Sequence, residues 1–182
     1  MIRRALPAGL VLVVLLAGCG GGGGGSSTTS AADWASSYCS EASAWVSALQ
    51  SARESLLNDN GSTNAQDAVQ SVSLATNTFT IALGRLGAPD TPNGSAAQKA
   101  AKELGESVQG RVARASAAVD TNNSNVTPAQ QAAVARKQAT ASIAEISSTT
   151  AQLEQGDPQL AAAMKASSEC ATLQADLAKE KG

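Results

Sequence analysis

Few side chains in this 182-residue chain can do covalent or acid–base chemistry, and three of them are the thiols of Cys19, Cys39 and Cys170. A thiol can form a disulfide, bind a metal, attack a substrate or accept a covalent modification. Histidine is absent, which removes the usual general base and the commonest transition-metal ligand. Glu103 and Glu106 stand three residues apart and could bind a cation, but this spacing is common by chance. We therefore expect no enzymatic activity, no cofactor and no metal site.

Cys19 stands at the end of a short apolar segment, residues 5–17, which follows Arg3 and Arg4. The segment is shorter than the roughly 20 residues that a helix needs to cross a bilayer. Its length suits the apolar part of a signal peptide whose two arginines stay on the cytoplasmic side. The four residues Leu16-Ala17-Gly18-Cys19 resemble the lipobox of bacterial lipoprotein precursors.

The resemblance implies that a diacylglyceryl group is attached to the Cys19 thiol and that a peptidase cleaves just before it. Residues 1–18 would then be the signal peptide, and Cys19 would anchor the mature chain to the outer face of the cytoplasmic membrane through fatty acyl chains such as palmitate. Two acyl chains form a stable anchor, since each buried methylene contributes about 0.8 kcal/mol. An ordinary signal peptide that is cut nearby and an uncleaved membrane anchor are the alternatives.

Residues 19–32 begin with Cys19 and continue with a glycine tract and then Ser and Thr, a composition typical of a flexible tether. The Ser and Thr residues are also possible acceptors of O-linked sugar. We expect the globular domain to span residues 33–180. The whole chain has 13 Lys and Arg against 15 Asp and Glu, and this balance argues against binding to nucleic acid.

Five segments of the domain carry small and apolar residues at alternating spacings of three and four, which is the pattern of packed helices. They lie near residues 33–57, 64–86, 95–120, 127–155 and 157–178. Gly-, Pro- and Asn-rich stretches separate them, and no segment alternates as a strand does. The sequence therefore predicts an all-α domain, an antiparallel up-and-down bundle of four or five helices. Because small residues dominate the seams, the helices should pack closely around a thin core.

Cys39 falls in the first expected helix and Cys170 in the last, both on or beside the apolar seam. In an exported protein such a pair is most often a disulfide, which would join the first and last helices. Two buried free thiols and a redox pair are the alternatives. A redox pair would more often be a Cys-x-x-Cys motif at a helix start, which is absent.

Five further residues are candidates for a ligand site or an interface. Trp34, Tyr38 and Trp45 share one side of the first helix, where they are either core anchors or the lining of a pocket that binds a ligand or lipid headgroups. Leu74 and Ile81 lie behind the main seam of the second helix. Either a fifth helix covers them, which we expect, or a partner does.

Two functions follow as hypotheses. The first is a non-enzymatic, lipid-anchored envelope protein that binds a partner protein or a cell-wall component, and it predicts an exposed apolar or charged face. The alternative is a helical bundle that binds a small ligand or lipid through Trp34, Tyr38 and Trp45. It predicts a cavity with a volume on the order of 300 Å³ that is lined by those rings. An enzyme would need carboxylates with raised pKa values in a cleft.

Overall fold

The computed structural model describes residues 29–58, 62–119 and 127–179. These residues form an all-helical domain, as predicted, and their only β contact is an isolated bridge between Thr29 and Pro89. The helices are α1 (Ala31–Asn58), α2 (Ser62–Arg85), α3 (Gly94–Val119), α4 (Pro128–Gly156), α5 (Pro158–Ala166) and α6 (Ser168–Lys179). The predicted signal peptide, Cys19 and most of the predicted tether lie outside the described residues. Among the helices described, none is both long enough and apolar enough to cross a membrane.

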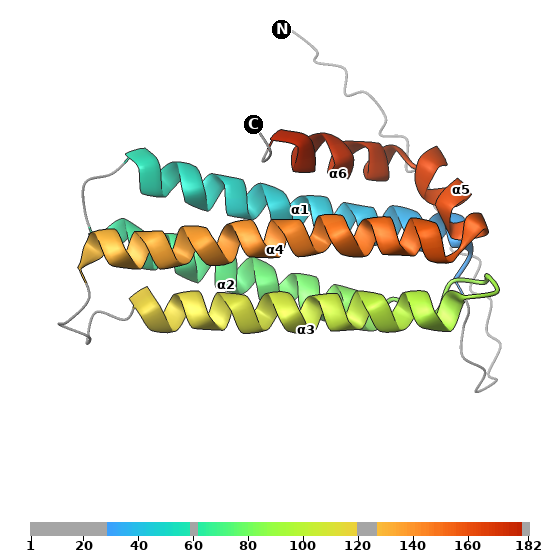
Figure 1. The fold of residues 1–182 in the computed structure, drawn as a ribbon, viewed down its shortest axis with the longest axis horizontal. Coiled ribbons are helices and arrows are strands. Elements are labelled where there is room, and N and C mark those ends of the chain that lie inside the picture. Colours follow the sequence, from blue (N-terminus) through green and yellow to red (C-terminus); the bar gives the residue numbers. More distant parts are fainter. Residues whose placement is uncertain (1–28, 59–61, 120–126, 180–182) are drawn as a thin grey trace, which may run out of the picture.

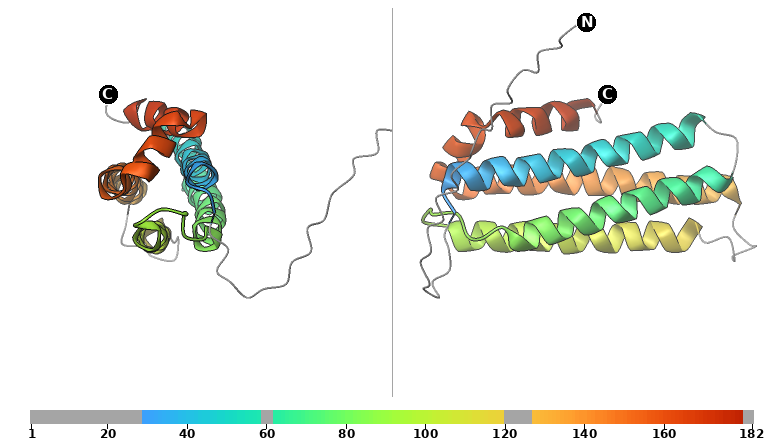
Figure 2. Two further views of the ribbon diagram at one scale, coloured as in Figure 1. Left: turned by 90° about the vertical axis from the view of Figure 1, so that its right-hand side faces the viewer. Right: turned by 180° about the vertical axis from the view of Figure 1, so that it is seen from behind.

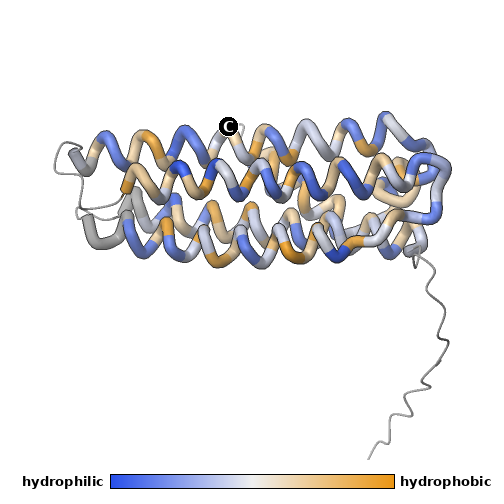
Figure 3. The backbone as a smooth tube through the Cα atoms, turned by 90° about the horizontal axis from the view of Figure 1, so that it is seen from below, coloured by the Kyte–Doolittle hydropathy of each residue, from blue (hydrophilic) through white to orange (hydrophobic). Residues whose placement is uncertain are grey.

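The four long helices, α1 to α4, lie side by side along the long axis of the domain, and α5 and α6 pack at one end and along one side (Figures 1 and 2). α3 packs against α2 and α4, whereas α1 packs against α2, α5 and α6. Hydrophobic positions recur along each helix between hydrophilic ones (Figure 3), as expected for helices with one buried face. The core therefore runs along the centre of the bundle.

The disulfide predicted between Cys39 and Cys170 is present and joins α1 to α6, with Cα atoms 4.8 Å apart. Both cysteines are buried. The bridge closes a long loop, since 131 positions separate the two residues. It therefore restricts the unfolded chain strongly.

The last predicted helix, over residues 157–178, is in fact two helices, α5 and α6, so the described chain has six helices rather than four or five. Ser167 separates them. Its backbone N–H donates to Met164 O at 3.3 Å, and its hydroxyl accepts the N–H of Cys170 at 3.3 Å, so it ends α5 and caps α6. The turn lets α6 lie along α1, where Cys170 meets Cys39.

The predicted start of α4 and the predicted turn after it are confirmed. Thr127 caps α4 in a reciprocal capping box with Gln130, and Pro128 occupies the first turn. Asp157 caps α5, and its buried carboxylate accepts the N–H groups of Leu160 and of Asn93 in the α2–α3 connection. Burial opposes the charge on Asp157, but the Thr91 side chain and the N–H groups of Leu160, Asn93 and Gln159 together outweigh it and lower the pKa. This carboxylate therefore ties the α2–α3 connection to the α4–α5 corner.

α2 and α3 approach closely at Gly105. A Cβ atom there would lie 3.3 Å from the Cα atom of Thr80, and the Thr80 hydroxyl donates to Gly105 O at 3.1 Å. Glycine costs about 1 kcal/mol relative to Ala inside a helix. Here the absence of a side chain on Gly105 allows the backbones of α2 and α3 to come into contact.

Candidate functional site

Trp34 and Tyr38 are fully buried core residues at the start of α1. Their rings stack with centroids 5.3 Å apart and an interplanar angle of 5°. The Trp34 indole N–H donates to Gly87 O at 2.9 Å, and the Tyr38 hydroxyl lies 3.1 Å from Thr150 Oγ1. These contacts agree with the core-anchor interpretation of the two rings.

The environment of Tyr38 raises the pKa of its phenol to about 12. Burial is the main cause, and the negative charge of Glu154 adds to it, whereas the hydrogen bond to Thr150 acts in the opposite direction. Tyr38 is therefore held in its neutral form throughout the physiological range.

Trp45 is also buried, but its surroundings differ. Its indole N–H donates to the Thr76 hydroxyl at 2.8 Å, and its ring lies against Phe79 with centroids 5.9 Å apart. Thr76 in turn donates to Val72 O at 2.7 Å, so the indole is held in one position. Beyond this fixed ring the core is not filled.

A hollow of about 120 Å³ lies between α1, α2, α3 and α4, with Trp45 and Val72 among its buried lining. α1 and α4 are close where Tyr38 meets Thr150, and they separate toward the N-terminal end of α4 (Figure 1). Alanines supply much of the wall where longer side chains would fill the space. They are Ala52, Ala68, Ala115, Ala135 and Ala139. The small seam residues that predict close packing thus leave a hollow, open on one side, in this half of the bundle.

Two arginines stand on the open side of the hollow. Arg53 of α1 and Arg136 of α4 are both exposed and both line it, and no acidic residue is among the described lining residues. Thr140, also exposed, lies on the same side. The Arg136 Nε–H donates to Ala132 O at 3.3 Å, which holds the guanidinium near the helix. The hollow thus has a largely apolar floor and two guanidinium groups at its rim.

A second depression, of about 390 Å³, lies between α4, α5 and α6. Glu154 and Lys165 are among its lining residues, and no aromatic side chain is. Neither depression is lined by Trp34 or Tyr38. The three aromatic residues of α1 therefore do not share either of these two depressions.

Leu74 and Ile81 remain on the surface of α2, 65% and 45% exposed, so the prediction that a fifth helix covers them is wrong. The reason is the turn at Ser167, which directs α6 onto α1 instead. Between Asp67 and Arg85, moreover, α2 carries no charged residue. We call the exposed side of this segment, marked by Leu74, Thr78 and Ile81, the α2 face.

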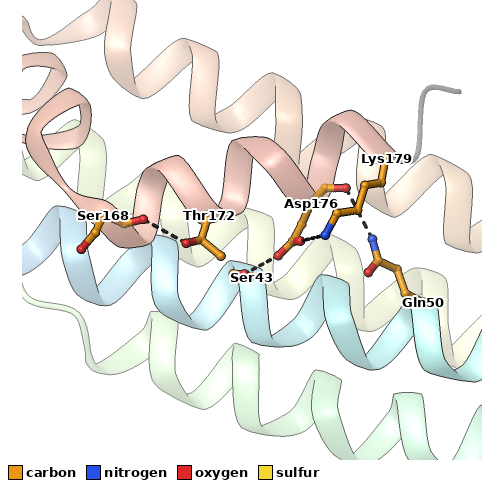
Figure 4. A network of polar contacts seen from close by, with 6 residues as sticks. All are labelled: Ser43, Gln50, Ser168, Thr172, Asp176 and Lys179. Carbon is orange, nitrogen blue, oxygen red and sulfur yellow. Dashed lines mark hydrogen bonds and ion pairs between the residues drawn. The ribbon is translucent and has the colours of Figure 1, made fainter.

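A buried carboxylate that the sequence analysis did not single out joins α6 to α1 (Figure 4). Asp176 accepts a hydrogen bond from the Ser43 hydroxyl at 2.7 Å and forms an ion pair with Lys179 Nζ at 2.8 Å. Gln50 Nε2 donates to the backbone oxygen of Asp176 at 3.4 Å. The hydrogen bonds from Lys179 and Ser43 lower the pKa of Asp176 against the effect of burial. The sequence does contain a signal for this contact, because Asp176 is an acidic residue within the apolar seam of the last helix and stands three positions before a lysine.

The candidate acidic pair on α3 lies on the surface of the domain. Glu103 and Glu106 are exposed, and Glu103 pairs with Lys99 at 3.7 Å. Within the part of the chain that the structure describes, no group of three or more metal-ligating side chains comes together. Elsewhere on α3, Arg111 forms an ion pair of 2.8 Å with Glu145 of α4, which links the two helices.

Comparison of the chain with models of protein families, with curated proteins and with solved structures gives no match. The sequence and the geometry of the described residues therefore carry the functional argument.

Proposed function

We propose that this chain is a non-enzymatic, lipid-anchored protein of the bacterial cell envelope whose helical domain binds a partner protein through the α2 face. The likeness of Leu16-Ala17-Gly18-Cys19 to a lipobox supports the anchor, with Cys19 as the lipidated residue on the extracytoplasmic side of the membrane. The glycine tract that follows supports a tether. A cell-wall component is the other partner class that this location allows.

We propose further that α1 to α4 form an antiparallel up-and-down bundle. The connections between them are short, at residues 59–61, 86–93 and 120–127, and short connections favour neighbours that run in opposite directions. The bundle supplies a rigid support for the α2 face.

The observation that carries the proposed function is the exposure of Leu74 and Ile81 on a stretch of α2 that has no charged residue. Residues seven positions apart lie on the same side of a helix, about 10.5 Å from one another along its axis. Apolar residues with this spacing are what a second helix packs against in a coiled coil or a helix groove. Because residues 68–84 carry no charge, such a partner would desolvate no charged side chain of this stretch of α2.

The alternative hypothesis, a ligand site built from Trp34, Tyr38 and Trp45 together, has less support. The first two rings pack on each other and on the backbone near Gly87. Only Trp45 borders a hollow.

The test is photo-crosslinking in intact cells with a photoreactive amino acid in place of Leu74. We expect one discrete adduct with a second envelope protein, and we expect the Cys19→Ser change to reduce it because the domain would leave the membrane. The matched control places the same amino acid at Gln109, an exposed position of α3.

Charge insertion provides the second arm. With the photoreactive residue at Thr78, the double change Leu74→Glu and Ile81→Glu should abolish the adduct. The double change Gln109→Glu and Ser116→Glu, with the same spacing on the exposed side of α3, should leave it intact. No adduct from position 74, equal adducts from positions 74 and 109, or an adduct between two copies of this chain would each contradict the proposal.

A further inference from the structure

We propose that the partner of the α2 face presents a helix that runs antiparallel to α2, with a basic residue near its C-terminal end that meets Asp67 and an acidic residue near its N-terminal end that meets Arg85. This inference rests on the function proposed above and specifies the chemistry of the partner. It follows from a stripe of exposed residues that extends beyond the α2 face at both ends.

The α2 face is the middle of this stripe, which we call the α2 stripe. Its residues follow one another at spacings of four, three, four, three and four, so they lie on one side of the helix within about 80° of one another. All are exposed, and they are Asp67, Ser71, Leu74, Thr78, Ile81 and Arg85. In the right-hand view of Figure 2, α2 lies in front of α4, and no described helix covers its near side. The spacing is that of the a and d positions of a coiled coil.

The middle of the stripe sets the apolar part of the partner. The Thr78 hydroxyl donates to Leu74 O at 3.2 Å, so Thr78 can be covered by an apolar side chain without losing this hydrogen bond. Ser71 and Thr78 are smaller than Leu74 and Ile81, so the partner helix has room for large apolar residues opposite them. A second copy of α2 would bring only two large apolar residues to the contact. A different protein with more of them therefore fits the stripe better.

The two ends of the stripe carry opposite charges. Asp67 lies in the second turn of α2 and Arg85 is its last residue, so about 27 Å of helix separates them. Neither forms an ion pair with a residue that the structure describes. Because both stand just outside the uncharged residues 68–84, they would flank the apolar contact at its solvent-exposed ends. Charges in such a position determine which partner binds and in which direction.

The order of the charges sets the direction of the partner helix. Acidic residues near the N-terminus of a helix and basic residues near its C-terminus complement the helix dipole. α2 follows this rule, with Asp67 nearer its N-terminus and Arg85 at its C-terminus. A partner helix that follows the same rule brings opposite charges to both ends only when it runs antiparallel to α2. In the parallel direction, like charges would meet at both ends and repel.

Photo-crosslinking at two positions of the stripe tests the direction. The photoreactive amino acid replaces Ser71 in one variant and Ile81 in another, in the full chain and in intact cells, and mass spectrometry locates the crosslinked residue of the partner. We expect both labels on one segment of the same protein. The label from position 81 should precede the label from position 71 by about ten residues, because both helices have the same rise per residue.

Charge reversal tests the two ends of the stripe. With the photoreactive residue at position 78, Arg85→Glu and Asp67→Lys should each lower the adduct yield about fivefold, an effect of the size expected for an exposed ion pair. Arg114→Glu and Glu106→Lys, both exposed on α3, are the matched controls and should leave the yield unchanged. Changing the acidic residue of the partner that faces Arg85 to Lys should restore the adduct of the Arg85→Glu variant.

The possible results separate this inference from the proposed function. Labels in the reverse order, labels on two separate segments, or yields that Arg85→Glu and Asp67→Lys leave unchanged would overturn the inference, whereas a discrete adduct from position 74 would still support the proposed function. Adducts that form from position 74 but from neither position 71 nor position 81 would also overturn the inference alone. A crosslink to α2 of a second copy, or no adduct from any of these positions, would contradict both.

Discussion

At the scale of single residues, the domain depends on a few large side chains set among alanines. Tyr38 is the sole tyrosine of the chain and is fully buried, with its hydroxyl beside Thr150 and its ring on Trp34. Thr150 belongs to α4, so one phenol links the first and fourth helices at the end of the bundle that holds the disulfide. Its protonation state therefore affects the stability of this contact.

We expect the pKa of Tyr38 to be about 12 in the folded protein, above the ordinary phenol value of 10.0. The folded pKa lies above the unfolded one, so the folded state holds the proton more tightly. The stabilisation is fully present below pH 10 and is lost as pH rises toward 12, where two pKa units amount to roughly 3 kcal/mol. The measurement is the absorbance of tyrosinate between about pH 9 and pH 12, recorded for the native protein and for the protein unfolded in urea. Equal midpoints in both states would contradict the burial of the phenol.

At the scale of elements, α6 is held on α1 by a disulfide near its start and by a polar contact near its end. The Asp176 carboxylate accepts hydrogen bonds from the Ser43 hydroxyl and the Lys179 ammonium group, and these bonds favour its ionised form. Because Lys179 is largely exposed, the contact with Ser43 carries more of the stabilisation. α6 is thus fixed at two points, which accounts for its position along α1.

Ser43→Ala should lower the free energy of unfolding by about 1.5 kcal/mol at neutral pH, the usual value of a hydrogen bond to a charged group. The pKa of Asp176 is lowered in the folded state, so this stabilisation is present above about pH 4, the unfolded value, and disappears as pH falls through the folded pKa. Urea unfolding of wild type and variant at several pH values measures the difference. Ser47→Ala, exposed one turn further along α1, is the control and should have little effect.

The sequence predicts most of the elements because their signals are local. Caps such as Thr127 and breaks such as Gly156-Asp157-Pro158 act within one turn of helix, and the two cysteines identify neighbours without any geometry. The break at Ser167 was missed because serine occurs inside helices as well as at their ends, and neither Gly nor Pro accompanies it.

The surfaces were harder to predict because they depend on where whole helices lie. The exposure of Leu74 follows from the direction that α6 takes after Ser167, which no local pattern encodes. A hollow forms where alanines of four different helices face one another, and it is absent where a long side chain from a neighbouring helix fills the space between them. Spacing shows that Ala52, Ala115 and Ala139 face inward, but it does not show that they face the same space.

At the scale of the whole molecule, the disulfide dominates stability because it closes a loop across 131 positions. The chain-entropy estimate for such a loop is about 5 kcal/mol at most, which is a large share of the net stability of a small domain. The alanine-rich core and its hollow add less burial than a core of larger residues would. The fold thus depends on its covalent bond more than a densely packed bundle does.

Replacing both Cys39 and Cys170 by Ala should lower the free energy of unfolding by about 3–5 kcal/mol. The measurement is urea unfolding of the variant and of wild type with and without reductant. Reduced wild type should match the variant, and the control Cys19→Ser should behave as oxidised wild type. An unfolding midpoint that reductant leaves unchanged would contradict a stabilising bridge.

The lipid anchor at Cys19 is the claim that places the domain at the membrane, and the mass of the N-terminal peptide tests it directly. The protein is isolated from the membranes of the cells that make it, digested, and analysed by mass spectrometry. We predict a mature chain that begins at Cys19 and carries a diacylglyceryl group on its thiol, and we predict that Cys19→Ser moves the domain out of the membrane fraction. A mature chain that begins elsewhere, or an unmodified Cys19 thiol, would contradict the account.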